Sequence, residues 1–397
     1  MKNFLLFALG AFLFASCAKD DVETIVKHYP DEDLAIIQAN LNLPSNPIDY
    51  TPALPAHLAG FSATAAGTID DDMATLGRVI FYDKSISKDG SISCASCHEQ
   101  TLGFADDRAV SEGVEDNETD RNSLALGAFV SFRRYYNMVI GGGARAGFFW
   151  DEGAPQLEVQ AKATIENKKE MGMDLGELVD RLQGIDYYQP LFRAAFRRDN
   201  AIDEDNIAFA VSEFVNSIIS AEAKFDQAHP NNTSPNQLQA DWSGFTAMEN
   251  RGKNLFVDNC SSCHGFSLSP AFAFMSGVAQ TVGNNGLDLE YEDNGVGERS
   301  SLMADNGKFK IPLLRNVEVT GPYMHDGRFE TLEEVIDFYS EGIQNHDNLD
   351  QKLRGSDGKA KQMNFSNQEK QDLIAFLHTL TDDAMMSAER FSDPFPQ

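Results

Sequence analysis

The chain has 397 residues, enough for two domains of ordinary size. Hydrophobic residues make up 42% of it, which suffices for buried cores. Its 61 acidic and 32 basic residues give a net charge of −29, and so acidic a surface repels phosphate backbones. The composition argues against a nucleic-acid partner and favours basic or weakly charged partners.

The N-terminus has the layout of a secretory leader. Lys2 precedes an apolar run over residues 4–14, which is shorter than the roughly 20 residues that span a bilayer. Small residues stand directly before Cys17, as in the lipobox of bacterial lipoproteins. We predict a signal peptide over residues 1–16 and lipidation of Cys17, which anchors the protein in the periplasm or on the outer-membrane surface. A plain signal peptide and a buried N-terminal helix are the alternatives.

Residues 17–72 are polar and contain prolines, and we expect a tether and N-terminal arm with one short helix over residues 31–42. A first domain over residues 73–228 follows, in which apolar residues recur at helical spacing. This spacing predicts helices over residues 73–81, 154–165, 175–182, 188–197 and 204–219, the last with Asp203 as its N-cap.

A linker rich in Pro and Asn over residues 229–241 leads to a second domain over residues 242–397. Helices are expected over residues 242–257 and 366–380, the latter opening on a capping box that starts at Ser366. Strand signals are few and short. The predicted fold class is therefore mainly α.

Four of the five cysteines form two matching C-x-x-C-H patterns. This pattern is the signature of a covalently bound c-type haem, because two thiols add to the porphyrin vinyl groups and the adjacent histidine binds the iron. We predict two haem c groups with His98 and His264 as iron ligands. The attachment cysteines are Cys94, Cys97, Cys260 and Cys263.

Other uses of paired cysteines fit less well. A zinc ribbon places its pairs about 15–20 residues apart, whereas these pairs lie in separate halves of the chain. A thioredoxin-like pair needs no following histidine, and a disulfide across three residues is strained. Helix, haem motif, ligand loop and terminal helix is the plan of class I cytochromes c, so we expect two such domains with one haem each.

Several histidines lie outside the two motifs. His28, His57 and His229 stand beside stretches rich in Pro or Asn, and we expect them in solvent. His378 lies on the C-terminal amphipathic helix, where a packing role is expected.

Four segments together resemble the di-haem cytochrome c peroxidase family, and the similarity extends over about residues 73–381. They are LGRVIFYDKSISKDGSISCASCH, GFFWDEGAPQLEVQA, ENKKEM and GKFKIPLLRNVEVTGPYMHDGRFETLEEVIDFY. The resemblance implies a peroxide-binding N-terminal haem and an electron-transfer C-terminal haem, with Trp150 between them. It also implies that Gln160 and Glu170 are the distal polar residues. A carboxylate there can take a proton from peroxide and return it to the departing oxygen.

Two positions depart from the usual pattern of the family. Many members hold a histidine that closes the first haem at the position of Val114, and valine cannot bind iron. The usual methionine ligand of the second haem falls on Tyr339, which resembles the MauG branch of the family. A core aromatic is the alternative for Tyr339, with Met275, Met303 or Met324 as the ligand instead. Gly153 stands where the family usually has arginine.

The resemblance further implies a calcium ion between the domains, bound by Asn122 and by the carbonyl groups of Thr320 and Pro322. The predicted reaction is reduction of hydrogen peroxide with electrons from a small cytochrome c or cupredoxin. The alternatives are MauG-like oxidation of a protein side chain through high-valent haem, and a di-haem electron carrier without catalysis. Whether the chain forms a homodimer is left open.

Overall fold

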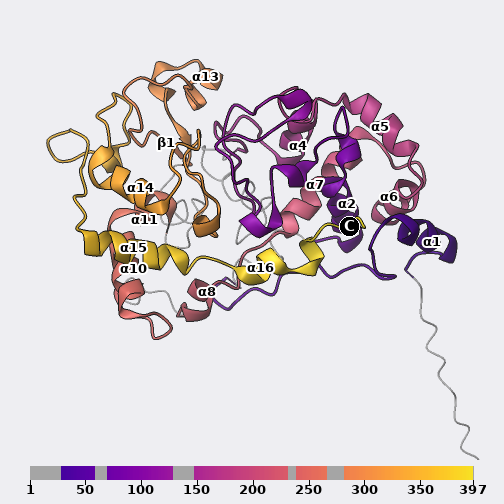
Figure 1. Ribbon diagram of the computed structural model, residues 1–397, viewed down its shortest axis with the longest axis horizontal. Coiled ribbons are helices and arrows are strands. Elements are labelled where there is room, and N and C mark those ends of the chain that lie inside the picture. The colour runs from indigo at the N-terminus through magenta and orange to yellow at the C-terminus, as the bar shows by residue number, and fades with distance from the viewer. Residues whose placement is uncertain (1–27, 59–68, 128–146, 231–237, 266–280, 397) are drawn as a thin grey trace, which may run out of the picture.

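The computed structural model describes residues 28–58, 69–127, 147–230, 238–265 and 281–396. Two helical lobes lie side by side, with the N-terminal lobe in indigo and magenta and the C-terminal lobe in orange and yellow (Figure 1). The strands β1 (Val282–Gly283) and β2 (Phe309–Lys310) form one short antiparallel pair, in which Val282 faces Lys310. The described part of the chain is mainly α, as the sequence predicts.

The N-terminal lobe is a set of helices around one apolar core. Its helices are α2 (Asp71–Tyr82), α4 (Leu157–Glu166), α5 (Leu175–Gln183), α6 (Tyr188–Phe196) and α7 (Glu204–Ser217). All five helices expected from the apolar spacing are present, and Asp203 caps α7 by accepting a hydrogen bond from the backbone of Asn206. Helices α2 and α7 cross at Gly77, where an added Cβ would lie 1.9 Å from the carbonyl oxygen of Ala210.

The C-terminal lobe is built on a second helix pair. Its helices are α10 (Ala247–Asn259), α11 (Ser261–His264), α13 (Val296–Ser300), α14 (Leu332–Asp337) and α15 (Asn367–His378). Helices α10 and α15 cross at Gly252, whose added Cβ would lie 1.8 Å from the carbonyl oxygen of Asp372. Ser366 and Glu369 form the expected capping box of α15.

Helix α10 begins five residues later than expected, because Thr246 and Glu249 form a capping box that the sequence analysis missed. Trp242 is buried ahead of this helix, and its backbone N–H donates to the side chain of Asn250 at 2.8 Å. A local side-chain bond therefore sets the helix start, although the apolar pattern continues before it.

Short 3₁₀ and π turns connect these helices. The 3₁₀ turns cover Lys84–Ile86, Cys94–Ser96, Gln100–Leu102, Val114–Asp116, Met303–Asp305, Val317–Val319, Gln351–Leu353 and Glu389–Phe391, and the π turn covers Phe338–Gly342.

Both ends of the described chain pack on the N-terminal lobe. The arm contains α1 (Asp31–Asn40) and buries Ile37 and Tyr50 completely, so it contributes to the core of the N-terminal lobe. After α15 the chain crosses through α16 (Asp383–Ser387) and ends beside α2 (Figure 1). There Arg78 donates from Nε to the carbonyl oxygen of Ser392 at 2.6 Å.

A buried charged cluster joins the arm, the linker and the C-terminal lobe. Asp226 on α8 (Lys224–Ala228) accepts two hydrogen bonds from Arg315, at 2.7 and 2.8 Å, and one from His57 at 3.1 Å. The ring of His57 stacks on His229 with 4.1 Å between centroids. The expectation that His57 and His229 are solvated is therefore wrong, because their partners come from distant parts of the chain. His28 is exposed, as expected.

The predicted signal peptide, Cys17 and Met275 lie outside the described residues. Within the described residues, no helix is long and apolar enough to cross a membrane.

Candidate functional site: two cysteine motifs, two cavities and the wall between them

The first C-x-x-C-H motif begins with a 3₁₀ turn over Cys94–Ser96, separated from α2 by a loop that contains the 3₁₀ turn Lys84–Ile86. Cys94, Cys97 and His98 line one cavity together. The Nδ1 atom of His98 lies 2.9 Å from the carbonyl oxygen of Phe104, which can only accept, so Nδ1 carries the proton and Nε2 is left to bind a metal. Burial lowers the pKa of His98, which favours the neutral imidazole that coordinates iron.

The second motif follows α10 immediately, forms the short helix α11 and lines a second cavity. Its Cys260, Cys263 and His264 all contribute to that cavity wall. The Nδ1 atom of His264 lies 3.2 Å from the carbonyl oxygen of Pro312, and burial lowers the pKa of this imidazole to about 4. Each cavity thus presents two thiols and one neutral imidazole in a mostly apolar wall, a donor set that fits a covalently bound haem.

The competing uses of the cysteines find no support in this geometry. The four motif cysteines form no disulfide with one another, and burial raises the pKa of Cys94 and Cys260 to about 12. The described residues contain no group of three His, Cys, Asp or Glu side chains that could hold a metal ion on their own.

Glu170 and Gln160 line the same cavity as the first motif. Gln160 lies on α4 and donates to the hydroxyl oxygen of Thr164 at 3.3 Å, while Glu170 accepts from the side chain of Asn167 at 3.1 Å. Burial raises the pKa of Glu170, and the hydrogen bonds from Thr164 and Asn167 oppose this rise. A half-buried carboxyl with a raised pKa is suited to exchanging a proton near neutral pH.

Val114 packs into the core of the N-terminal lobe and does not line the first cavity. Its backbone N–H donates to the carbonyl oxygen of Glu170 at 2.9 Å, so this segment supports the turn that carries Glu170. Among the described residues, His98 is the one histidine in the cavity wall. Gly153 also lines this cavity, with the carboxylate of Asp151 close to where a Cβ would be.

Trp150 lies in the wall between the two cavities and lines both. Its indole Nε1–H donates to the carbonyl oxygen of Asn122 at 2.8 Å, and its own carbonyl oxygen accepts from the backbone of Lys310 at 2.6 Å. On the C-terminal side, the ring of His325 lies 6.5 Å from the indole and stacks on Phe309 at 3.7 Å. The indole is therefore fixed from both lobes.

Tyr339 lines the second cavity and lies in the π turn that follows α14. Burial raises the pKa of its phenol to about 12, against a hydrogen bond from Asn285. Of the methionines considered as alternatives, Met324 lines this cavity, whereas Met303 lines neither cavity and is 85% exposed. Met303 is thereby excluded as a ligand.

The three residues expected to bind calcium all line the second cavity: Asn122, Thr320 and Pro322. The side-chain Nδ2 of Asn122 donates to the carbonyl oxygens of Arg108 and Ala109 at 3.0 and 3.3 Å, which fixes the plane of its amide. Amide and carbonyl oxygens are ligands that suit calcium.

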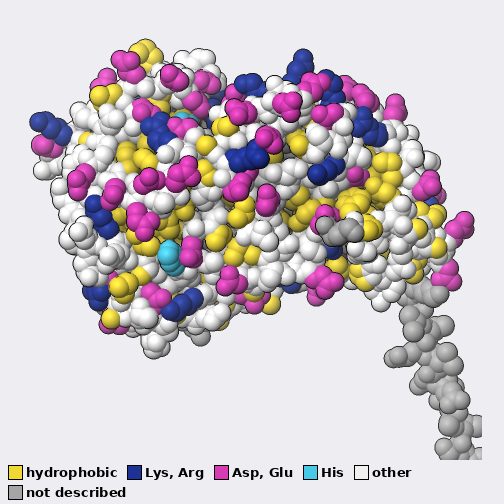
Figure 2. Space-filling model, viewed as in Figure 1, with side chains coloured by type: hydrophobic (Ala, Val, Ile, Leu, Met, Phe, Trp, Pro, Cys, Tyr) yellow, Lys and Arg dark blue, Asp and Glu magenta, His cyan; other side chains and the backbone are white. Residues whose placement is uncertain are grey.

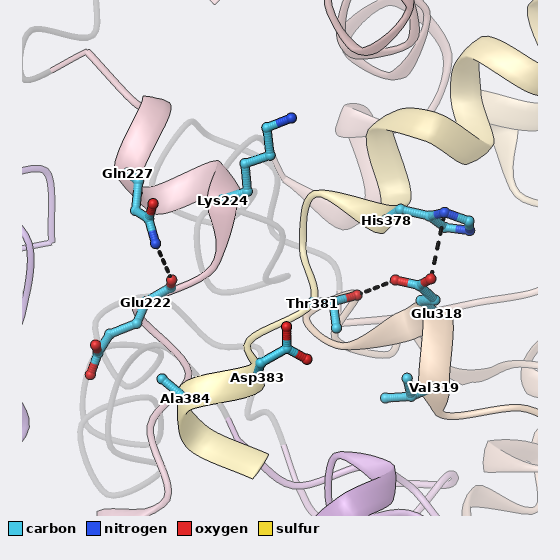
Figure 3. Close-up of a pocket in the computed structure, with 9 residues that line it drawn as sticks. All are labelled: Glu222, Lys224, Gln227, Glu318, Val319, His378, Thr381, Asp383 and Ala384. Atoms are coloured by element: carbon cyan, nitrogen blue, oxygen red, sulfur yellow. Dashed lines mark hydrogen bonds and ion pairs between the residues drawn. The ribbon is translucent and has the colours of Figure 1, made fainter. Parts of the chain in front are cut away.

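A third hollow lies away from both motifs, between α8, α16 and the end of α15 (Figure 3). In it, Glu318 accepts a hydrogen bond from Thr381 at 2.5 Å and pairs with His378 at 3.5 Å. The side chain of His378 is 47% exposed, so the expected packing role for this residue is wrong.

Two helical lobes, each with a C-x-x-C-H motif on its own cavity and with one tryptophan in the wall between them, define a protein built for two covalently attached haems. The family model described as di-haem cytochrome c peroxidase matches residues 71–234. The methylamine utilization protein MauG of Methylorubrum extorquens is 29% identical over 376 residues, which cover 94% of this chain and 91% of that protein. Cytochrome-c peroxidase IdrP2 of a Pseudomonas species is 31% identical over 340 residues, covering 79% of this chain and 82% of that protein.

Solved structures agree with these relatives. A MauG-like protein associated with microbial copper homeostasis superposes with a TM-score of 0.67 at 29% identity, covering 89% of this chain and 98% of that one. The chain belongs to the di-haem cytochrome c peroxidase family, and it is an oxidoreductase of the peroxidase or MauG type.

Proposed function

We propose that the protein reduces hydrogen peroxide to water with electrons from a small redox protein, either a cytochrome c or a cupredoxin. The observation that carries this proposal is that Glu170 and Gln160 line the same cavity as Cys94, Cys97 and His98. An electron carrier needs no acid–base group beside its haem, so this arrangement argues against carriage alone.

The chain's own residues supply proton transfer and orientation. When bound, the two haems would supply redox-active iron and together the two electrons that reduction of one peroxide to water requires. Glu170 accepts a proton from peroxide at its carboxylate and returns it to the departing oxygen, and Gln160 orients peroxide through its amide. Trp150 lies between the cavities and shortens the path for electrons. Because Val114 offers no ligand, peroxide reaches the first haem without prior reduction.

Further details of the proposal concern ligands and location. Tyr339 binds the second iron, and Asn122, Thr320 and Pro322 hold a calcium ion between the lobes. Lipidated Cys17 attaches the protein to a membrane of the cell envelope. Each of these assignments rests on the sequence. The iron ligand and the calcium ligands are also supported by their position, because all four residues line the second cavity.

Tyr339 also favours a second candidate function, MauG-like oxidation of a protein side chain. A tyrosine ligand lowers the potential of the second iron, whereas methionine raises it. We expect the Tyr339→Met variant to show a higher reduction potential of the second haem in a redox titration. An oxidised spectrum that persists after peroxide in the wild type, and decays faster in Tyr339→Met, would favour the MauG-like reaction over ordinary peroxidase turnover.

The test of the peroxidase proposal is the reaction of the fully oxidised protein with one equivalent of hydrogen peroxide, followed by Soret absorption. We expect a prompt change in the wild type and a rate about 10²–10⁴-fold lower in Glu170→Gln. Glu166→Gln is the matched control, because Glu166 ends the same helix as Gln160, is exposed and does not line the cavity. Equal rates in Glu170→Gln and wild type would refute the role of Glu170.

The same reaction has an expected pH dependence. The carboxylate form of Glu170 is the base, and burial raises the pKa of this group. The rate should therefore fall as pH is lowered through a pKa above the ordinary range of glutamate, and Glu170→Gln should lose this acid limb. A stopped-flow pH profile of both proteins checks it.

A further inference from the structure

Lys310 occupies the wall between the two haem cavities. Among the described residues that line both cavities, Lys310 is the one with a charged side chain and Trp150 is the one with an aromatic side chain. Lys310 lies on β2, and its backbone N–H donates a hydrogen bond to the carbonyl oxygen of Trp150 at 2.6 Å. Its ammonium donates a hydrogen bond to the carbonyl oxygen of Gly147 at 2.8 Å. The backbone N–H and the side chain of Lys310 therefore both bind the segment that carries Trp150.

Glu152 pairs with this ammonium. Its Oε1 lies 3.6 Å from Nζ of Lys310, and the two side chains are 7% and 17% exposed. Thr281 donates to the other carboxylate oxygen at 3.2 Å, so each carboxylate oxygen has a polar neighbour. Glu152 also has a φ of 56°, in the left-handed region that side chains such as glutamate rarely adopt.

A purely stabilising role explains this pair poorly. Buried ion pairs contribute little to stability, because desolvation of both charges offsets their attraction. Here the backbone of Glu152 is also strained, which is unfavourable. Burial lowers the pKa of Lys310 and the charge of Glu152 opposes this, so the carboxylate helps to keep the amine charged.

We propose that Lys310, held by Glu152, is a positioning residue that sets the electrostatic potential felt by both haems. Charges in a low-dielectric wall act strongly on redox groups on either side, since water does not screen them. A positive charge there stabilises the reduced, less positive iron and raises its potential. Lys310 lines both cavities and Glu152 lines neither, so we expect the charge of Lys310 to act on the irons more strongly than that of Glu152.

The inference rests on the proposed function only in requiring both haems to be bound. It is tested by equilibrium redox titration of the two-haem protein without peroxide, so its failure is distinct from a failure of peroxidase activity. Lys310→Met should shift both potentials downward, and Glu152→Gln should shift both upward in a titration at acidic pH, where the amine of Lys310 stays charged without the carboxylate. Lys308→Met is the matched control, because Lys308 is two residues away, pairs with Asp305 and lines neither cavity.

Haem content and the electron paramagnetic resonance spectrum of each oxidised variant show whether ligation is retained. If Lys310→Met fails to mature, Lys310→Gln, whose amide can still donate to the carbonyl oxygen of Gly147, decides in its place. Potentials in both variants equal to those of Lys308→Met would overturn the proposal. A shift confined to one haem would also overturn it, since Lys310 would then act on that haem only.

Discussion

Asp226 is a buried carboxylate at the junction of the arm, the linker and the C-terminal lobe, where it pairs with Arg315 and His57. Its side chain is 1% exposed and that of Arg315 is 0% exposed. Breaking a buried pair by removing one partner leaves the other charge uncompensated, which costs about 3–5 kcal/mol. We therefore expect Asp226→Asn to lower the free energy of unfolding by about this amount, measured by guanidinium denaturation of the haem-loaded protein.

The exposed pair of Lys88 and Glu115 provides the control, because its side chains are 52% and 55% exposed. Glu115→Gln should change the free energy of unfolding by less than about 1 kcal/mol. Similar losses in both variants would show that the Asp226 cluster is no more than an ordinary ion pair.

The Asp226 cluster also predicts a pH dependence of stability. Burial alone would raise the pKa of Asp226, but the charge and hydrogen bonds of Arg315, together with His57, lower it to about 2. A carboxyl with a depressed pKa adds stability above its unfolded pKa, and this contribution is lost as pH falls through the folded value. The stability difference between wild type and Asp226→Asn should therefore shrink between about pH 4 and pH 2.

For single residues, the sequence could predict those that belong to recognisable motifs. It could not predict the side-chain pairs that form between distant segments of the chain. The roles of Trp150, Gln160 and Glu170 are implied by the family resemblance, and all three residues line the first cavity. His57 and His229 were misplaced, because Pro-rich and Asn-rich surroundings say nothing about a partner 169 residues away. Lys310 and Glu152 were missed for the same reason.

Among the helices, prediction succeeded where side chains near in sequence decide the outcome. The caps Asp203 and Ser366 bond to backbone groups three residues away, so their patterns are visible in the sequence. The return of the chain through α16 to the N-terminal lobe could not be predicted, since it depends on contacts such as that between Arg78 and Ser392. The π turn that contains Tyr339 likewise has no simple sequence pattern.

The helix ahead of each haem motif crosses its partner at a glycine, Gly77 on α2 and Gly252 on α10. An added methyl group would collide with a backbone carbonyl in either case, so the helices must separate. We expect Gly77→Ala and Gly252→Ala each to lower the free energy of unfolding by at least about 1–3 kcal/mol, the range typical of overpacking. The measurement is the melting temperature, which should fall in both variants.

Gly184→Ala is the control for this prediction. Gly184 ends α5 with a φ of −82°, and the nearest atom to an added Cβ lies at an ordinary 3.4 Å. Melting temperatures of Gly77→Ala and Gly252→Ala that match that of Gly184→Ala would contradict the close crossings.

For the whole molecule, the net charge of −29 governs encounters with a redox partner. Acidic side chains are spread over both lobes on the face shown in Figure 2, with basic side chains between them. Such a surface attracts a basic donor from a distance, and salt weakens the attraction because the Debye length falls to about 8 Å at physiological ionic strength.

The salt dependence of electron transfer follows from this charge. The rate of reduction by a basic small cytochrome c should fall as sodium chloride is raised, whereas the rate with an acidic donor should rise or stay flat. An uncharged small-molecule reductant controls for salt effects on the haems themselves, and its rate should be constant. Equal salt dependence for the basic and acidic donors would mean that a local patch, rather than the overall charge, guides docking. Stopped-flow measurements with the two-haem protein at several ionic strengths separate these outcomes, because long-range attraction changes the association rate and leaves the limiting transfer rate unchanged.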